Sequence, residues 1–223
     1  MSALAKVLAI AAILSVSLYA ARYAAADFFY ERAKRSYDSL DISKLQYASE
    51  LKELKQDVDR SLMLRRGSAN ALDFKADLQY QSWWLSPDGQ YLQDSDLLQN
   101  AVTLHMEAQN YRKDWSFSAA RLALIYSNQR RLDKRFARWF AQAHRLGLYE
   151  TTIARSLMVV GLNNWAQLSE AQKRMTQDFV AASIEQKANS PTMMRSVLDS
   201  YQLRDVVCAS LLNTTRKTKV CQD

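Results

Sequence analysis

The sequence contains few of the residues that interrupt regular secondary structure, with only four glycines and two prolines among 223 residues. A β-sandwich or β-barrel needs a turn about every 8–12 residues, and glycine and proline supply most of these turns. Their scarcity argues against these all-β classes and favours an all-α fold. The chain is long enough for an N-terminal anchor and one domain with a sizeable hydrophobic core.

The sequence also lacks the patterns that usually mark an enzyme. Its two histidines, His105 and His144, lie on or beside apolar stripes without Cys, Asp or Glu at metal-ligand spacing, so we predict packing roles and no metal site. There is no Gly-x-Ser-x-Gly motif and no phosphate-binding glycine loop. Acid pairs such as Asp94 and Asp96 face different sides of a helix. We therefore expect no catalytic residues and no cofactor, which makes a carbohydrate-active enzyme the weakest alternative.

The only two cysteines, Cys208 and Cys221, lie close together near the C-terminus. This arrangement fits one disulfide in an oxidising compartment. A disulfide that closes a loop this short would stabilise the folded chain by about 3 kcal/mol. The alternative is a pair of free thiols with Cys208 buried. The disulfide interpretation depends on export of this part of the chain.

The one long apolar segment runs from Val7 to Ala21 and is flanked by Lys6 and Arg22. With the following alanines it approaches the ~17–25 residues that a spanning helix needs. We assign residues 1–26 to a signal anchor or transmembrane segment. A cleaved signal peptide is the alternative, because the alanines at 24–26 offer a small-residue cleavage site.

The orientation of this anchor is contested by charge. Basic residues after the segment would hold the body in the cytoplasm by the positive-inside rule. The short N-terminal tail, the signal-like layout and the paired cysteines favour the opposite orientation. We predict a single-pass inner-membrane protein with its body in the periplasm.

Helical periodicity dominates the rest of the chain. Residues 27–66 read as a charged helical linker followed by a first helix, with a stripe through Leu51, Leu54 and Val58. Residues 67–223 read as a helical repeat-like domain, with helix pairs near 68–110 and 115–145. Expected helix starts are Ser68, the Ser169–Gln172 capping box, and Ser190 before Pro191. The last of these helices would carry Leu198 and could extend to Leu212.

Two antiparallel helices and a third are expected between Trp115 and Trp165. Leu146-Gly147 is predicted to end the second helix through a left-handed glycine, and Gly161 to end the third. The spacing of Ala123, Tyr126 and Phe136 approximates a tetratricopeptide repeat with an extra residue. The full prediction is all-α antiparallel helix pairs forming a degenerate tetratricopeptide-like, right-handed solenoid with an N-terminal hydrophobic anchor helix.

Basic residues are in excess, giving a formal net charge of +7 and a pI of about 9.4. The densest group is predicted to share one face of a helix, and comprises Arg130, Arg131, Lys134, Arg135 and Arg138. Such a face could bind an acidic polysaccharide or an acidic segment of a partner. A solvated outer face is the alternative. Nucleic acid is disfavoured, because exposed aromatics are not interleaved with the basic residues and the chain carries an anchor.

The segment from Ala119 to Leu168 resembles the VpsP-type exopolysaccharide-biosynthesis proteins. The resemblance is carried by Ala-Arg-Leu-Ala at 120–123, by 133–143, by Leu146-Gly147 and above all by Gly-Leu-Asn-Asn-Trp-Ala-Gln-Leu at 161–168. The plan of a hydrophobic segment followed by a repeat-like helical body also fits.

This resemblance implies an accessory protein that works with polysaccharide polymerisation and export machinery in a Gram-negative envelope. It carries no catalytic residues to this chain. We therefore expect a membrane-anchored periplasmic scaffold for the biofilm matrix that acts by protein–protein interaction. The alternative is a module that binds acidic polysaccharide through residues 130–138.

Overall fold

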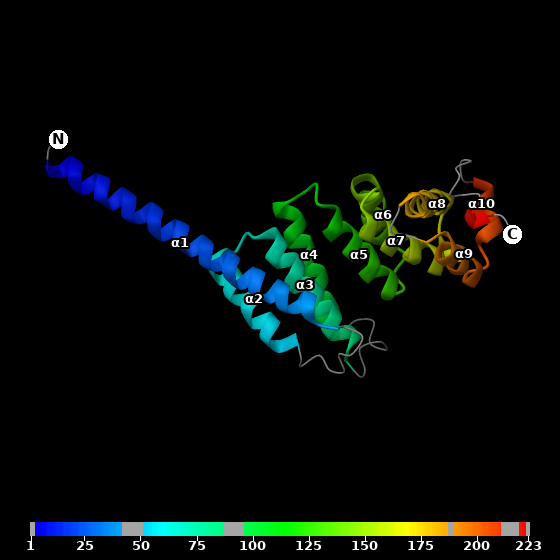
Figure 1. The fold of residues 1–223 in the computed structure, drawn as a ribbon, viewed down its shortest axis with the longest axis horizontal. Coiled ribbons are helices and arrows are strands. Elements are labelled where there is room, and N and C mark those ends of the chain that lie inside the picture. The colour runs from blue at the N-terminus through cyan, green and yellow to red at the C-terminus, as the bar shows by residue number, and fades with distance from the viewer. Residues whose placement is uncertain (1–2, 42–50, 87–95, 187–189, 211–218, 222–223) are drawn as a thin grey trace. The chain divides into compact units, whose positions relative to one another are not determined.

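The computed structural model describes residues 3–41, 51–86, 96–186, 190–210 and 219–221 (Figure 1). Every regular element among these residues is a helix, which confirms the all-α class. In chain order the helices are α1 (Ala3–Ser39), α2 (Lys52–Leu64), α3 (Ala69–Trp84), α4 (Asp96–Tyr111), α5 (Ser116–Asn128), α6 (Lys134–Gly147), α7 (Thr151–Asn163), the 3₁₀ helix η3 (Trp165–Gln167), α8 (Glu170–Glu185), α9 (Pro191–Ser200) and α10 (Arg204–Ser210).

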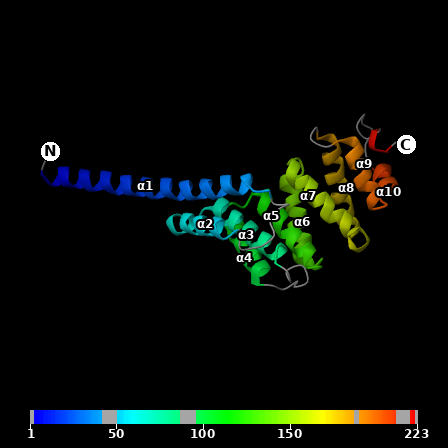
Figure 2. The same ribbon diagram turned by 60° about the horizontal axis from the view of Figure 1, so that its bottom comes forward.

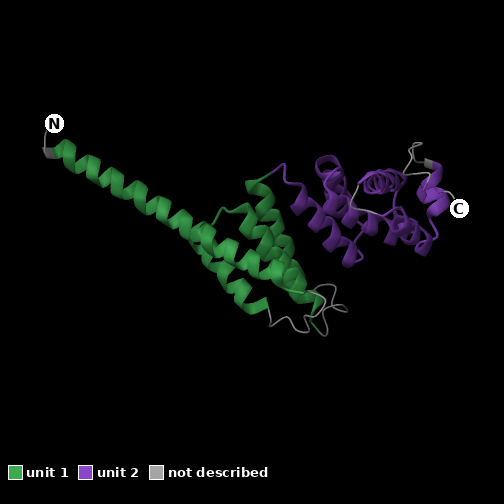
Figure 3. Cartoon of the chain, in the orientation of Figure 1, with its two compact units in different colours: residues 1–112 green, residues 113–223 purple. Residues whose placement is uncertain are grey.

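The chain divides into two compact units, residues 1–112 and 113–223 (Figure 3). The boundaries expected from the sequence, after residues 26 and 66, do not coincide with this division. The reason is packing: one buried cluster joins Ala33 of α1 and Val58 of α2 to Leu78 of α3, across the boundary expected after residue 66. The hydrogen bond from Arg22 to the Leu64 carbonyl crosses the boundary expected after residue 26.

The N-terminal hydrophobic helix is present and is continuous with the charged segment that follows it. α1 runs unbroken from Ala3 to Ser39, and its most apolar window has a mean hydropathy of 2.0 with none of it buried. Length and composition suit either a single membrane span or a signal sequence. Figure 2 shows the first half of α1 extending beyond α2.

In unit 1, α1 and α2 form an antiparallel hairpin whose apolar sides close on α3. Tyr30 and Tyr37 of α1 meet Phe74 of α3 edge to face, with ring centroids 6.1 and 5.4 Å apart. Such aromatic pairs add to the stabilisation that burial alone provides. The predicted stripe of α2 is confirmed in the described residues, because Leu54 and Val58 are buried.

α3 pairs with α4, as expected for residues 68–110. The Ser68 hydroxyl accepts a hydrogen bond from the Ala71 amide, which confirms the predicted N-cap. Of the adjacent tryptophans at the end of α3, Trp83 is buried and Trp84 is 48% exposed. Neighbouring residues on a helix point about 100° apart, so one face cannot bury both.

In unit 2, α5 pairs with α6, and α7 with α8. The centre is aromatic: Phe140 stacks on Phe136 of its own helix and meets Phe179 of α8 edge to face at 5.6 Å. Pairing of sequence neighbours is the pattern of helical repeats. A right-handed solenoid would have to continue through both units, and each unit is described separately, so the solenoid stays a prediction.

The helix end predicted at Gly147 is confirmed in position but not as a left-handed glycine, and the end predicted at Gly161 is wrong. Gly147 is the last residue of α6 and Gly161 lies inside α7, and neither has a positive φ. Both glycines instead allow close packing. A Cβ on Gly161 would lie 2.2 Å from Thr176 Oγ1 of α8, and one on Gly147 would lie 2.9 Å from Ile153 Cγ2 and Ser116 Cβ.

The C-terminal helices begin as predicted and end earlier. The Ser169–Gln172 capping box and Pro191 at the first position of α9 are both present. The expected extension toward Leu212 is wrong within the described residues, because α9 stops at Ser200 before Gln202, which has φ 56°.

After this break, α10 carries Cys208, which forms a disulfide with Cys221 across a Cα–Cα distance of 5.8 Å. The Arg195 guanidinium donates to the carbonyls of Lys219 and Val220 at 2.9 and 3.2 Å. The disulfide and these hydrogen bonds attach the C-terminal segment to the end of unit 2.

Candidate functional site

The basic residues proposed from the sequence do not share one helix. Arg130 lies in the turn after α5 with φ 53°, and Arg131 follows it in the α5–α6 connection. α6 begins only at Lys134, because the Asp133 carboxylate accepts the amides of Arg135 and Phe136 at 2.8 and 3.3 Å. The interpretation of a continuous helical face over 130–138 is therefore corrected. An N-capping aspartate between the basic residues was the signal for it.

The remaining three, Lys134, Arg135 and Arg138, are exposed at the start of α6. Arg135 bonds Asp133 at 2.7 and 3.0 Å and lies 5.2 Å over the Tyr126 ring. The carboxylate raises the pKa of Arg135, and the guanidinium lowers the pKa of Asp133. The positive charge of Arg135 is thus largely matched locally, and Lys134 and Arg138 carry the excess charge of this helix start.

Each histidine is held by an aspartate on a neighbouring helix. His105 of α4 is fully buried, with its Nδ1 2.8 Å from Asp73 Oδ1 and its Nε2 3.7 Å from Asp77 Oδ1. His144 of α6 has its Nε2 2.8 Å from Asp178 Oδ2. Sequence spacing could not reveal these partners, since they lie 32 and 34 residues away.

Among the described residues, no three His, Cys, Asp or Glu side chains come together in a way that could hold a metal ion. The contacts of both histidines are helix-to-helix links.

Residues 161–168 include the end of α7 and connect it to α8. Gly161 gives α7 room against Thr176. The Asn164 side-chain amide donates to the Val160 carbonyl at 2.7 Å and to the Ser127 hydroxyl of α5 at 2.9 Å. Leu168 is buried. These contacts give the segment a structural role, because they fix where three helices of unit 2 meet.

The end of the α1–α2 hairpin nearest the apolar segment is held by arginine contacts that sequence reasoning missed. Arg22 Nε donates to the Leu64 carbonyl at 2.6 Å, at the C-terminus of α2. Arg65 lies 3.3 Å from Asp27 Oδ1 and 4.9 Å over the Tyr23 ring. A cation is favourable at the negative end of a helix dipole. Arg22, the first charged residue after the apolar run, therefore holds the C-terminus of α2 beside the end of that run.

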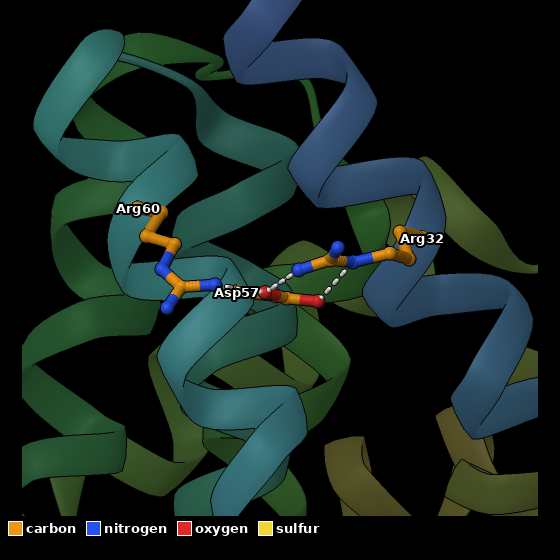
Figure 4. Close-up of polar contacts among 3 residues, drawn as sticks. All are labelled: Arg32, Asp57 and Arg60. Carbon is orange, nitrogen blue, oxygen red and sulfur yellow. Dashed lines mark hydrogen bonds and ion pairs between the residues drawn. The ribbon is translucent and has the colours of Figure 1, made fainter.

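Further along the hairpin, Asp57 of α2 lies between two arginines (Figure 4). Arg32 of α1 donates to both Asp57 carboxylate oxygens, with Nε 2.6 Å from Oδ2, and Arg60 Nη1 lies 3.2 Å from Oδ1. The hydrogen bond from Arg32 is the main cause that lowers the pKa of Asp57. The pair connects α1 to α2 halfway along their shared length.

A polar pocket of about 630 Å³ lies in unit 1 at the end of the α1–α2 hairpin nearest the apolar segment. Its lining includes both carboxylates and guanidiniums, namely Asp27, Glu31, Arg65 and Arg112. Charges of both signs alternate there, and Asp27 and Arg65 neutralise each other. The pocket therefore presents no concentrated charge of one sign.

Comparisons of the chain with protein-family models, with curated proteins and with solved structures found no match.

Proposed function

We propose that this protein is a single-pass, membrane-anchored helical scaffold with its body in the periplasm. In this proposal it serves exopolysaccharide assembly or export by holding other membrane proteins. The membrane anchor is supported by the length of α1 that is not packed against other helices.

Exposed side chains run along α1 from Leu4 through Arg22, apart from the half-buried Ala5. The apolar run from Val7 to Ala21 would measure about 22 Å at ~1.5 Å per residue, and the exposed residues before it, with the Lys6 side chain reaching the headgroups, bring the length from Leu4 to about 27 Å. A bilayer hydrocarbon core is ~30 Å thick. The exposed apolar length therefore matches one crossing.

The packing of α1 favours retention of this segment over its cleavage as a signal peptide. Cleavage after Ala26 would remove Arg22 and Tyr23, which contact Leu64 and Arg65. It would also sever Ala26, which is fully buried. A signal peptide that is discarded has no need to pack against the mature body.

The disulfide supports a periplasmic body, because such bonds persist in oxidising compartments. The assignment to exopolysaccharide work rests on the resemblance of residues 119–168 to the VpsP-type proteins. The helix pairs of the body suit a protein-binding surface, since helical repeat bodies typically bind other proteins.

Deleting the gene and measuring secreted polysaccharide and biofilm tests this function directly. We expect matrix output to fall, and to return with the full chain but not with a body exported on a cleavable signal. Unchanged output in the deletion strain would contradict the proposal. If matrix output falls as expected, crosslinking followed by affinity capture from membranes would identify the proteins that the scaffold binds.

The second candidate function is binding of acidic polysaccharide at the start of α6, favoured by the exposed positive charges of Lys134 and Arg138. Charge reversal of these two leaves the Asp133–Arg135 pair intact. We expect Lys134→Glu with Arg138→Glu to abolish binding that also falls with salt. Arg145→Glu with Arg174→Glu, at exposed positions near the other end of α6 and on α8, makes the same change in net charge and is the matched control. Equal binding by both variants would dismiss this candidate.

A further inference from the structure

The C-terminal end of α2 is placed beside the point where the apolar part of α1 ends. Arg22 is the first charged residue after the apolar run, and its guanidinium reaches the carbonyls of Met63 and Leu64 at 3.5 and 2.6 Å. Because α1 is one continuous helix, no linker separates the proposed span from the packed body. If the span is inserted, Met63 lies at the boundary between hydrocarbon and headgroups.

The side chains at this end suit that boundary. Met63 is 74% exposed, and its carbonyl lies 3.5 Å from the Arg22 guanidinium, so an apolar side chain is open to solvent beside the end of the proposed span. Arg66 is exposed and has no hydrogen-bond or ion-pair partner among the residues that the structure describes. Arg65 and Arg22 lie next to it on the same end. An apolar side chain beside several arginines matches an interface where acyl chains give way to phosphates.

We propose that the end of α2, consisting of Met63, Leu64, Arg65 and Arg66 with Arg22 of α1, is a membrane-contact surface for anionic phospholipid headgroups. The proposal rests on the membrane span of the proposed function and adds a second contact with the same bilayer. Charge complementarity favours phospholipid as the occupant, since this surface carries three arginines and, among the described residues, the acid paired with one of them is Asp27, which is bound to Arg65. Glu31 lines the neighbouring pocket with Arg65 and is not paired with these arginines. Anionic lipid attracts basic residues near its surface, so Arg22, Arg65 and Arg66 would favour contact between this end of the body and the bilayer.

The test uses the full chain reconstituted in vesicles of phosphatidylcholine, with or without phosphatidylglycerol. A fluorophore is attached at Met63→Cys, since both native cysteines are in a disulfide. Quenching is measured with lipids that carry a nitroxide on the headgroup. Lys52→Cys at the opposite end of α2 is the matched control, about 17 Å away by helical rise.

We expect headgroup nitroxides to quench the label at position 63 and to leave the label at 52 bright. Phosphatidylglycerol should increase quenching at 63. Arg66→Glu should reduce the ratio of engaged to disengaged body by about fivefold or more, since one basic residue near an anionic surface has an effect of that size. Arg35→Glu makes the same charge change about 20 Å further along α1, beyond the ~10 Å screening length, and should have little effect.

Equal quenching at 63 and 52, or quenching at 63 that ignores both phosphatidylglycerol and Arg66→Glu, would overturn the inference. A label at Ile13→Cys read with acyl-chain nitroxides separates this failure from failure of the anchor. Quenching at position 13 without quenching at 63 removes the headgroup contact and leaves the span. Absence of quenching at position 13 overturns the span, and the headgroup contact with it.

Discussion

Replacing Gly161 by alanine should destabilise unit 2, although alanine is the better helix former. A methyl group at this position would lie 2.2 Å from Oγ1, 2.4 Å from Cγ2 and 2.8 Å from Cβ of Thr176. The Thr176 hydroxyl also donates to the Gln172 carbonyl at 2.9 Å, which holds the rotamer in place. Relief of these contacts therefore requires α7 and α8 to move apart.

Two opposing effects decide the magnitude. Alanine in place of glycine inside a helix gains about 1 kcal/mol of intrinsic helix propensity. Overpacking of a filled core typically costs about 1–3 kcal/mol, and contact with a Cβ that cannot rotate away belongs at the upper end. The expected net loss is about 2 kcal/mol, which lowers the midpoint of thermal unfolding by about 10 °C for a unit of this size.

The assay is thermal unfolding of the full chain in detergent, followed by circular dichroism and by tryptophan fluorescence. Gly147→Ala is the graded control, because its nearest contacts are 2.9 Å and involve side-chain atoms of Ile153 and Ser116. It should lower the midpoint less than Gly161→Ala.

A double variant tests the cause. Gly161→Ala combined with Thr176→Gly removes all three close atoms. The two changes should be less harmful together than the sum of the single changes by about 1 kcal/mol or more. If Gly161→Ala matches or exceeds the wild type in stability, helix propensity dominates and the close approach of α7 to α8 is refuted.

Three further outcomes are expected from local interactions. Ser169→Ala should lower the stability of unit 2 by about 1 kcal/mol in urea unfolding, because the α8 cap is lost. The pKa of Asp57 is lowered in the folded protein, so its ionised form stabilises unit 1 above the unfolded pKa of ~3.9, and this stabilisation is lost as the pH falls through the folded pKa. Asp57→Asn should therefore reduce the fall in the free energy of unfolding of unit 1 below about pH 4. Cys208 and Cys221 should resist thiol blocking in freshly lysed cells until a reductant is added, and reduction should cost about 3 kcal/mol; two free thiols would argue against export.

The sequence alone was sufficient for most of the helices and for the starting points of α3, α8 and α9. The serine of Ser169-x-x-Gln172 and the proline after Ser190 act within one turn of their own backbone. The stripe through Leu54 and Val58 has the helical period for the same local reason. Such signals do not depend on where the rest of the chain lies, so they can be interpreted from the sequence.

Local patterns were misleading where a residue serves a neighbour that is distant in sequence. Gly161 looked like a helix stop, since glycine often ends helices, yet it lies inside α7 opposite Thr176. The basic run at 130–138 looked like one helical face, yet Asp133 starts α6 within it. In the first case the deciding contact is tertiary, and in the second a local cap was overlooked.

The tertiary structure alone decided which remote groups meet. Burial of His105 beside Asp73 and the bond between Arg22 and the Leu64 carbonyl join residues 32 and 42 positions apart. The amino-acid sequence determined an apolar N-terminal helix and a helical body, because hydrophobic period and capping are local. Only packing decided that the end of α2 lies beside the end of the apolar segment, because that position depends on how the helices close on one another.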